Sequence, residues 1–176
     1  MALDFGGIAK GYAAEKMAAI LKKQNIRHAL LNLGGNVKTV GAKPDNSPWR
    51  IAIQHPDAKT DYLGVLSVSD TSVVTSGDYE RYFEKGKIRY HHILDPRTGA
   101  PARSGLRSVT VVCKDCTLAD GLSTALFVLG PEAAISFWQK QKEQFQFILF
   151  TENNTLYVTE KLLPVFETKL TVTAVR

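Results

Sequence analysis

The chain has 176 residues, of which 44% are hydrophobic, and a formal net charge of +5 at pH 7. This length and apolar content predict one domain with its own core and argue against a disordered chain. The positive charge is spread along the chain, so it favours anionic ligands in general, and the basic stripe with interleaved aromatics that would indicate nucleic-acid binding is missing. The sequence shows no signal peptide and no membrane segment, so the chain as given is expected to be soluble.

The first elements in the chain are a helix and a series of strands. Apolar residues at helical spacing predict an amphipathic helix over residues 8–23, which follows the start so closely that the chain looks cut out of a longer domain. Residues 28–33 and 37–40 predict two strands around the turn Gly34-Gly35, and further strands are expected at 49–54, 63–68 and 73–75. Residues 79–84 and 87–93 flank Lys85-Gly86 and predict a tight hairpin that carries His91 and His92 near its end.

The second half of the chain alternates strands with two helices. A valine-rich strand is expected at 107–113, and Thr117 to Asp120 resembles a capping box, which predicts a helix from 117 to about 129. Gly130-Pro131 indicates the end of that helix and the start of another, expected at 133–142. Strands at 145–150, 155–159 and 169–175 complete an α+β domain over residues 1–176, with a largely antiparallel or mixed β-sheet and helices packed against it.

The helix after Thr117 carries a candidate metal site. An apolar arc of roughly 100° is expected to face the core; it consists of Leu118, Leu122, Ala125, Leu126 and Leu129. Asp120 and Thr124 lie one turn apart on the opposite side, where a carboxylate and a hydroxyl could supply two oxygen ligands to Mg²⁺. The alternative is that Asp120 only completes the helix cap and Thr124 points into solvent.

The stretch before the first helix is a candidate phosphate site. Gly6 and Gly7 precede the helix and Lys10 lies in its first turn. Glycine allows close approach of a phosphate, and the backbone N–H groups at a helix start attract one. The spacing matches neither of the common nucleotide-binding glycine motifs, so a plain glycine turn beside an exposed lysine is the alternative.

Two further polar features leave alternatives open. The turn that contains Ser76 and Gly77 could be a hydrogen-bonding rim for a ligand or no more than a turn. His91 and His92 point to opposite faces of a strand, so at most one of them faces a given pocket. The C-x-x-C pair formed by Cys113 and Cys116 is compatible with ordinary reduced thiols, with a disulfide, or with a redox or metal role.

Five motifs, in this order along nearly the whole chain, resemble the ApbE family of FAD:protein FMN transferases. They are L-D-F-G-G-I-A-K-G-Y-A, L-N-L-G-G-N-V, T-S-G-D-Y-E-R-Y-F, Y-H-H-I-L-D-P-R-T-G-A-P and A-D-G-L-S-T-A-L-F-V-L-G. The resemblance implies an enzyme that cleaves the pyrophosphate of FAD, releases AMP and attaches FMN to a Thr or Ser hydroxyl of a target flavoprotein. It also implies a requirement for Mg²⁺.

The resemblance assigns roles to particular residues. Asp120 and Thr124 match the metal-binding side chains of the family. A backbone carbonyl within residues 7–9 matches the third protein ligand, and Ala9 is the preferred residue of the three. His92 matches the histidine before I-x-D-P and is expected to accept or orient the proton of the attacking hydroxyl, whereas His91 is expected to be structural. The residues expected to contact FAD are Gly6, Gly7, Lys10, Ser76, Gly77 and His92.

The family's proteins are about twice as long as this chain, and the portion that precedes the first motif and helps to hold the flavin is absent. The chain is therefore expected to correspond to the C-terminal part, as an excised domain, as a natural short form, or as a half that works with a separate N-terminal half. Two other functions are carried as alternatives: an FAD pyrophosphatase that yields FMN and AMP, and a non-catalytic family fragment. Full-length relatives are often lipoproteins outside the cytoplasm, and the compartment of this chain stays open.

Overall fold

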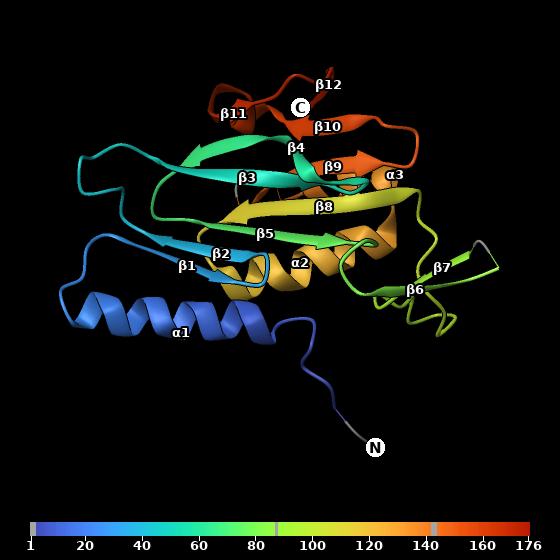
Figure 1. Cartoon of the computed structure of the whole chain (residues 1–176), viewed down its shortest axis with the longest axis horizontal. Coiled ribbons are helices and arrows are strands. Elements are labelled where there is room, and N and C mark those ends of the chain that lie inside the picture. The colour runs from blue at the N-terminus through green and yellow to red at the C-terminus, as the bar shows by residue number, and fades with distance from the viewer. Residues whose placement is uncertain (1–2, 87, 142–143) are drawn as a thin grey trace.

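Two apolar cores lie on the two faces of the largest sheet, whose strands cross the middle of Figure 1. The computed structural model describes residues 3–86, 88–141 and 144–176. Within these residues the largest sheet has seven strands, in the order β1-β2-β5-β8-β9-β10-β12. Their bounds are β1 (Ala29–Leu33), β2 (Asn36–Val40), β5 (Ser72–Gly77), β8 (Leu106–Cys113), β9 (Gln146–Thr151), β10 (Leu156–Thr159) and β12 (Val172–Val175).

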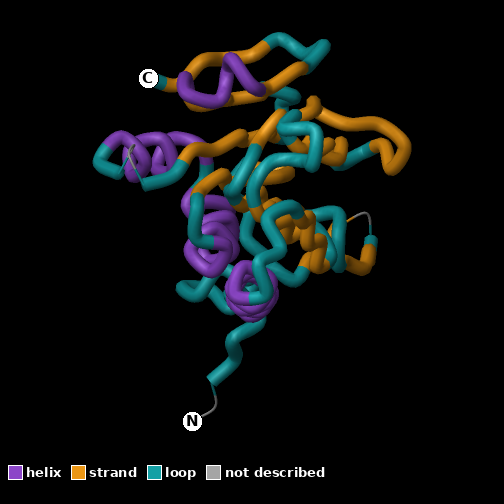
Figure 2. The backbone as a smooth tube through the Cα atoms, turned by 90° about the vertical axis from the view of Figure 1, so that its left-hand side faces the viewer, coloured by secondary structure: helices purple, strands orange, loops and turns teal. Residues whose placement is uncertain are grey.

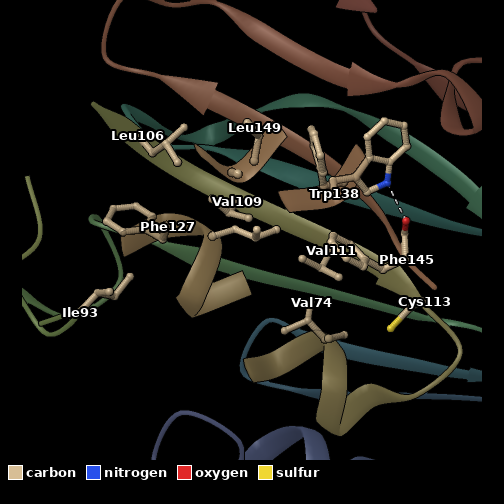
Figure 3. Packing of buried hydrophobic residues seen from close by; sticks show 14 of the residues in the cluster. Val74, Ile93, Leu106, Val109, Val111, Cys113, Phe127, Trp138, Phe145 and Leu149 are labelled. Carbon is tan, nitrogen blue, oxygen red and sulfur yellow. Dashed lines mark hydrogen bonds between the residues drawn. The ribbon is translucent and has the colours of Figure 1, made fainter. Parts of the chain in front are cut away.

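Alternation along the central strands divides their side chains between the two cores. Val109 and Val111 of β8 belong to the first core, whereas Val112 belongs to the second. The first core lies under helices α1 (Ala9–Lys23), α2 (Cys116–Leu129) and α3 (Pro131–Gln139). Figure 2 shows the helices on one side of the strand layer, and Figure 3 shows Trp138 of α3 packed in this core with its indole N–H donated to the Phe145 carbonyl oxygen.

The second core is closed by a smaller sheet. It contains β3 (Trp49–His55), β4 (Ala58–Val68) and β11 (Phe166–Glu167), and a 3₁₀ helix at Glu160–Val165 precedes β11. A separate hairpin of β6 (Tyr82–Lys85) and β7 (Ile88–His91) projects at one end of the molecule (Figure 1). Neighbouring strands are antiparallel except for β10 and β12, which are parallel.

This arrangement confirms the predicted α+β class, and the larger expected elements are present. The glycine turn between β1 and β2 has φ angles of 59° at Gly34 and 92° at Gly35, a conformation that favours glycine. The last helix was expected to end at residue 142 and is described as ending at Gln139. Position 142 lies outside the described residues, and so does position 87 of the predicted hairpin. The last strand starts at Val172 instead of 169, and the short strand β11 and the 3₁₀ helix were not predicted.

The predicted N-cap of α2 was wrong, and its predicted core face was right for Leu126, which is buried, but wrong in part. Asp115 is the N-cap, and its side chain accepts the backbone N–H groups of Thr117 and Leu118, so Asp120 does not cap the helix. Leu118 and Leu129, expected in the core, are 41% and 49% exposed. Asp120 was expected on the side of the helix that faces away from the core, but it is only 4% exposed.

The reason for the rotated face is the neighbouring helix. An ideal Cβ on Gly11 of α1 would lie 2.2 Å from the Cys116 carbonyl oxygen. The two helices are therefore closer together than they could be with any residue other than glycine at position 11. Ala14 and Ala18 continue this small-residue face of α1 and are buried. The side of α2 that carries Asp120 therefore packs against a second helix, a contact that helical periodicity alone does not reveal. Among the described residues no helix is long and apolar enough to cross a membrane.

Candidate functional site

A cavity of about 260 Å³ lies between the start of α1, the end of β5, the base of the β6–β7 hairpin and the first turns of α2. It is lined by Asp4, Gly6, Gly7, Lys10, Thr75, Ser76, Glu80, Arg81, His92, Ile93, Leu94, Asp120 and Thr124. Seven of the nine residues that the sequence singled out are in this set. Residues that are far apart in the sequence therefore meet at one place.

Asp120 is held in position by the helix beside it. Its Oδ2 accepts the backbone N–H of Gly11 at 2.8 Å. That N–H belongs to the first turn of α1, where backbone donors have no partner within the helix. The bond satisfies both groups and fixes the carboxylate at the cavity wall with one oxygen already used.

Three hydroxyl groups line up behind Asp120. Ser76 Oγ lies 2.8 Å from Ser123 Oγ and 3.2 Å from Thr124 Oγ1, and Ser123 Oγ donates to the Asp120 carbonyl oxygen at 2.9 Å. A hydroxyl has one proton but can also accept, so Thr124 keeps an oxygen lone pair that can point into the cavity. Strand β5 and helix α2 are thereby joined at the site. The expected turn at Ser76 and Gly77 was wrong, because both residues are the last two of strand β5 and pair with β8.

The start of α1 presents backbone and one cation to the cavity. Gly6 N–H donates to Asp4 Oδ1 at 2.6 Å, and the Phe5 carbonyl oxygen accepts the N–H groups of Ile8 and Ala9. Lys10 Nζ donates to the Gly34 carbonyl oxygen at 3.1 Å, so its ammonium is held between α1 and the β1–β2 turn. The positive end of the helix and Lys10 give this wall a positive potential.

His92 is oriented by the backbone at the base of the hairpin. Its ring Nδ1 lies 3.3 Å from the Arg81 carbonyl oxygen, which also accepts the His92 backbone N–H at 3.1 Å. A carbonyl can only accept, so this contact places the ring proton on Nδ1 and leaves Nε2 of the neutral ring as an acceptor. That nitrogen is the one that can take a proton from a bound hydroxyl.

His91 occupies the opposite, buried side. Its Nε2 lies 3.0 Å from the Ala102 carbonyl oxygen, its ring packs edge-on against Phe127, and it is 6% exposed. Burial lowers the pKa of His91, although the bond to Ala102 opposes this change. The two histidines thus point to opposite sides, with His92 at the cavity.

Two predicted residues lie outside the lining set. Ala9 is the exposed first residue of α1, while Gly7 in the same stretch lines the cavity. The Ile8 carbonyl oxygen is occupied by the Tyr12 N–H. Gly77 is buried, and an ideal Cβ there would lie 2.3 Å from the Tyr79 ring, so its role is to let that ring pack. The ligand roles of Ala9 and Gly77 stay predictions.

The charges around the cavity are unevenly balanced. Three carboxylates, from Asp4, Glu80 and Asp120, face two permanent cations, Lys10 and Arg81. Loss of water around the Glu80 carboxyl raises its pKa, and the nearby Lys10, His92 and Arg81 offset part of that rise. An anionic ligand would therefore meet excess negative charge unless it came with a cation.

The donor set fits a hard divalent cation. No group of three His, Cys, Asp or Glu residues suited to a metal occurs in the described part of the chain. The cavity instead offers the Asp120 carboxylate, the Thr124 hydroxyl and the glycine backbone, which are oxygen ligands. Mg²⁺ is commonly bound by one or two carboxylates together with waters and substrate phosphates, so these residues fit it.

Six lining residues were not singled out from the sequence: Asp4, Thr75, Glu80, Arg81, Ile93 and Leu94. All six fall within the quoted motifs that begin L-D-F-G-G, T-S-G-D-Y-E-R and Y-H-H-I-L-D-P, so the signal was in the chain. Cys113 and Cys116 are buried free thiols away from this lining set. Burial raises the pKa of both thiols to about 11, so they are protonated at neutral pH.

The sequence matches a family model and several curated proteins. The model of the ApbE family matches residues 1–149. A curated relative from Klebsiella pneumoniae, named FAD:protein FMN transferase, is 43% identical over 160 residues, which cover 90% of this chain and 48% of the relative. One of the same name from Treponema pallidum is 43% identical over 141 residues, covering 75% of this chain and 39% of the relative.

Solved structures give the same result. The crystal structure of the ApbE protein from Thermotoga maritima superposes with a TM-score of 0.83 at 37% identity, over 90% of this chain and 52% of that one. The structure titled flavin transferase ApbE from Vibrio cholerae gives 0.80 at 32% identity, over 93% and 52%. The chain spans about half the length of the relatives it matches.

Proposed function

The chain belongs to the ApbE family, and from this premise we propose that it transfers FMN from FAD to a Thr or Ser hydroxyl of a target flavoprotein, with Mg²⁺ as cofactor and AMP as the leaving group. The observation that carries the proposal is the single cavity in which Lys10, His92 and Asp120 meet. A phosphate-binding cation, a proton acceptor and a metal-binding carboxylate are the three kinds of group that this reaction needs.

The helix side of the cavity is proposed to hold the pyrophosphate and the metal. Asp120 and Thr124 would bind Mg²⁺ together with a backbone carbonyl, for which Gly7 lines the cavity and Ala9 was predicted. When bound, the ion neutralises charge that develops on the phosphate oxygens. Lys10 and the start of α1 attract and orient the same anion, and the carbonyl of Gly34 keeps the ammonium in place.

The hairpin side is proposed to serve the attacking hydroxyl. With its proton on Nδ1, His92 presents Nε2 to the cavity as a proton acceptor. General base catalysis of this kind typically contributes about 10²–10⁴-fold in rate. Leu94 and Ile93 line the same side of the cavity.

One experiment separates transfer from hydrolysis. The chain is incubated with FAD, Mg²⁺ and a Thr-containing acceptor, and the products are followed by mass spectrometry and by AMP release. An FMN increment on the acceptor supports the transferase. AMP and free FMN without the increment favour the pyrophosphatase alternative, because water then replaces the hydroxyl at the same site.

A second arm addresses the chain's length. The relatives are about twice as long, so the same assay is repeated with the N-terminal half of a full-length family member added as a separate polypeptide. Activity without that addition supports a self-sufficient enzyme. Activity that requires it supports a half that works with a partner. Absence of both the FMN increment and AMP release in both arms refutes the proposal.

A further inference from the structure

The β6–β7 hairpin stands apart from the rest of the sheet structure. Within the described residues it forms a two-stranded sheet of its own, and Figure 1 shows it projecting beyond the ends of the larger sheet. Every residue of β6 is exposed. Arg81, directly before β6, and His92, directly after β7, both line the cavity. The hairpin is therefore an extension of the candidate site into solvent.

One face of the hairpin anchors it to the body. Tyr82 pairs with His91 and Glu84 pairs with Arg89, and directly opposite residues share a face. His91 is buried, and Arg89 Nη1 lies 3.5 Å from Asp78 Oδ1. The Arg89 guanidinium also lies over the Tyr82 ring at 4.2 Å. These contacts fix the orientation of the other face.

The other face is an exposed apolar platform. Phe83 pairs with Tyr90, and their rings stack with centroids 5.1 Å apart and planes 7° apart. Phe83 is 62% exposed, and Ile88, on the same face, is 46% exposed. Stacked aromatics on an isolated hairpin leave apolar area in water that nothing in the described chain covers, which is the usual mark of a binding surface.

The exposed face of the hairpin continues along the chain past His92, the proposed general base, to Leu94. Burial alternates along residues 91–94, so His91 and Ile93 face inward while His92 and Leu94 are exposed. Leu94 is 53% exposed. Alternate residues from Ile88 through Tyr90 and His92 to Leu94 thus follow one extended stretch. A polypeptide in extended conformation has the matching two-residue period.

The charge of the hairpin selects the partner. Lys85 is exposed and forms no salt bridge within the described residues, whereas Arg81 lies close enough to the Glu80 carboxylate to lower its pKa. The acid of the hairpin, Glu84, is within 3.4 Å of Arg89. The platform is therefore bordered by the positive charge of Lys85, which complements an acidic segment.

We propose that the outer face of the hairpin, Phe83, Lys85, Ile88 and Tyr90, binds an extended acidic segment of the acceptor protein and leads its hydroxyl to His92. This inference rests on the proposed function, because it supplies the second substrate of that reaction. Phe83 and Tyr90 would pack against apolar side chains of the segment, and Lys85 would meet its acids.

The test is an NMR titration of the full ¹⁵N-labelled chain in the presence of FAD and Mg²⁺. A synthetic peptide is the probe. The peptide has one central threonine, valines at alternate flanking positions and aspartates at both ends. Its titration should shift the amide signals of β6, β7 and His92. A peptide with lysines in place of the aspartates should bind more weakly, and the difference in affinity between the two peptides should be larger at low salt.

Matched variants locate the surface. Phe83→Ser and Lys85→Glu should each weaken peptide binding about fivefold or more, as expected for residues central to an interface. Tyr62→Ser, which removes a 55% exposed strand aromatic, and Lys169→Glu, which reverses an exposed charge elsewhere, are the controls. These controls should bind the peptide as the parent does, and all four variants should retain FAD affinity.

The outcomes separate this inference from the proposed function. FMN transfer that is equal in the parent, Phe83→Ser and Lys85→Glu refutes the hairpin surface and leaves the transferase standing. A peptide that maps to the hairpin but receives no FMN, either from the chain alone or after addition of the separate N-terminal half, refutes the transferase and leaves the surface supported. Amide shifts confined to other elements, or an equal loss in the control variants, also overturn the hairpin surface.

Discussion

Replacing Gly11 by alanine tests the close contact between α1 and α2 on which the Asp120 carboxylate depends. The new Cβ would lie 2.2 Å from the Cys116 carbonyl oxygen and 2.7 Å from the Asp120 Cβ. Neither atom is the end of a flexible side chain, so the helices must move apart. Overpacking of this kind costs about 3 kcal/mol at the upper end of the usual range, while alanine in a helix regains about 1 kcal/mol over glycine.

The net loss is therefore about 2 kcal/mol, which lowers the melting temperature by roughly 4–8 °C for a chain of this size. Thermal and urea unfolding measure it, and Gly121→Ala is the matched control. That glycine is also in a helix, but its added Cβ would meet only the Ile8 Cγ2 at 3.3 Å. If Gly11→Ala proves as stable as Gly121→Ala and binds Mg²⁺ and FAD like the parent, the reasoning about this contact is wrong.

The remaining predictions concern the site and its pH dependence. Asp120→Asn can still accept the Gly11 N–H but loses the charge, so the Mg²⁺ concentration needed for half-maximal activity should rise about tenfold or more, and an unchanged requirement would exclude Asp120 as a metal ligand. His92→Gln should slow transfer by about 10²–10⁴-fold with FAD affinity unchanged in a direct titration; a loss of FAD affinity instead would contradict the base role. The lowered pKa of His91 means that the native state binds fewer protons than the unfolded state near and below pH 6.5, so the free energy of unfolding should fall on acidification from that pH, by at most about 1.4 kcal/mol per pH unit. His91→Phe should flatten this dependence in urea unfolding series, and an unaltered slope would assign the effect to other groups.

The sequence predicted the cavity better than it predicted the helix that forms it. Lys10, Ser76, His92, Asp120 and Thr124 were all singled out, because motifs keep the chemistry-bearing residues together in the chain. These residues meet only through tertiary packing, and single motifs do not give the distances between them.

The core face of α2 could not be read from its own pattern. Periodicity placed Leu118 and Leu129 inward, whereas the structure leaves both partly exposed. The deciding factor is Gly11, more than one hundred residues earlier in the chain, whose missing side chain admits the face that carries Asp120. The N-cap was misplaced for a local reason, because both Asp115 and Thr117 are good capping residues and Asp115 is the one that bonds to the backbone.

The two sides of the cavity differ in how they are attached to the fold. Asp120 and Thr124 belong to a helix packed against another helix and a sheet, whereas His92 belongs to the base of a hairpin that is joined to the body through one face. The side chains on the outer face of that hairpin are not among the described residues that contact Asp120, so substitutions there should leave the position of its carboxylate unchanged. If the proposed function and the proposed acceptor surface are both correct, the fold separates the residues that would hold the nucleotide from the face that would bind the acceptor, so that face could change to suit another acceptor without altering the metal-binding wall.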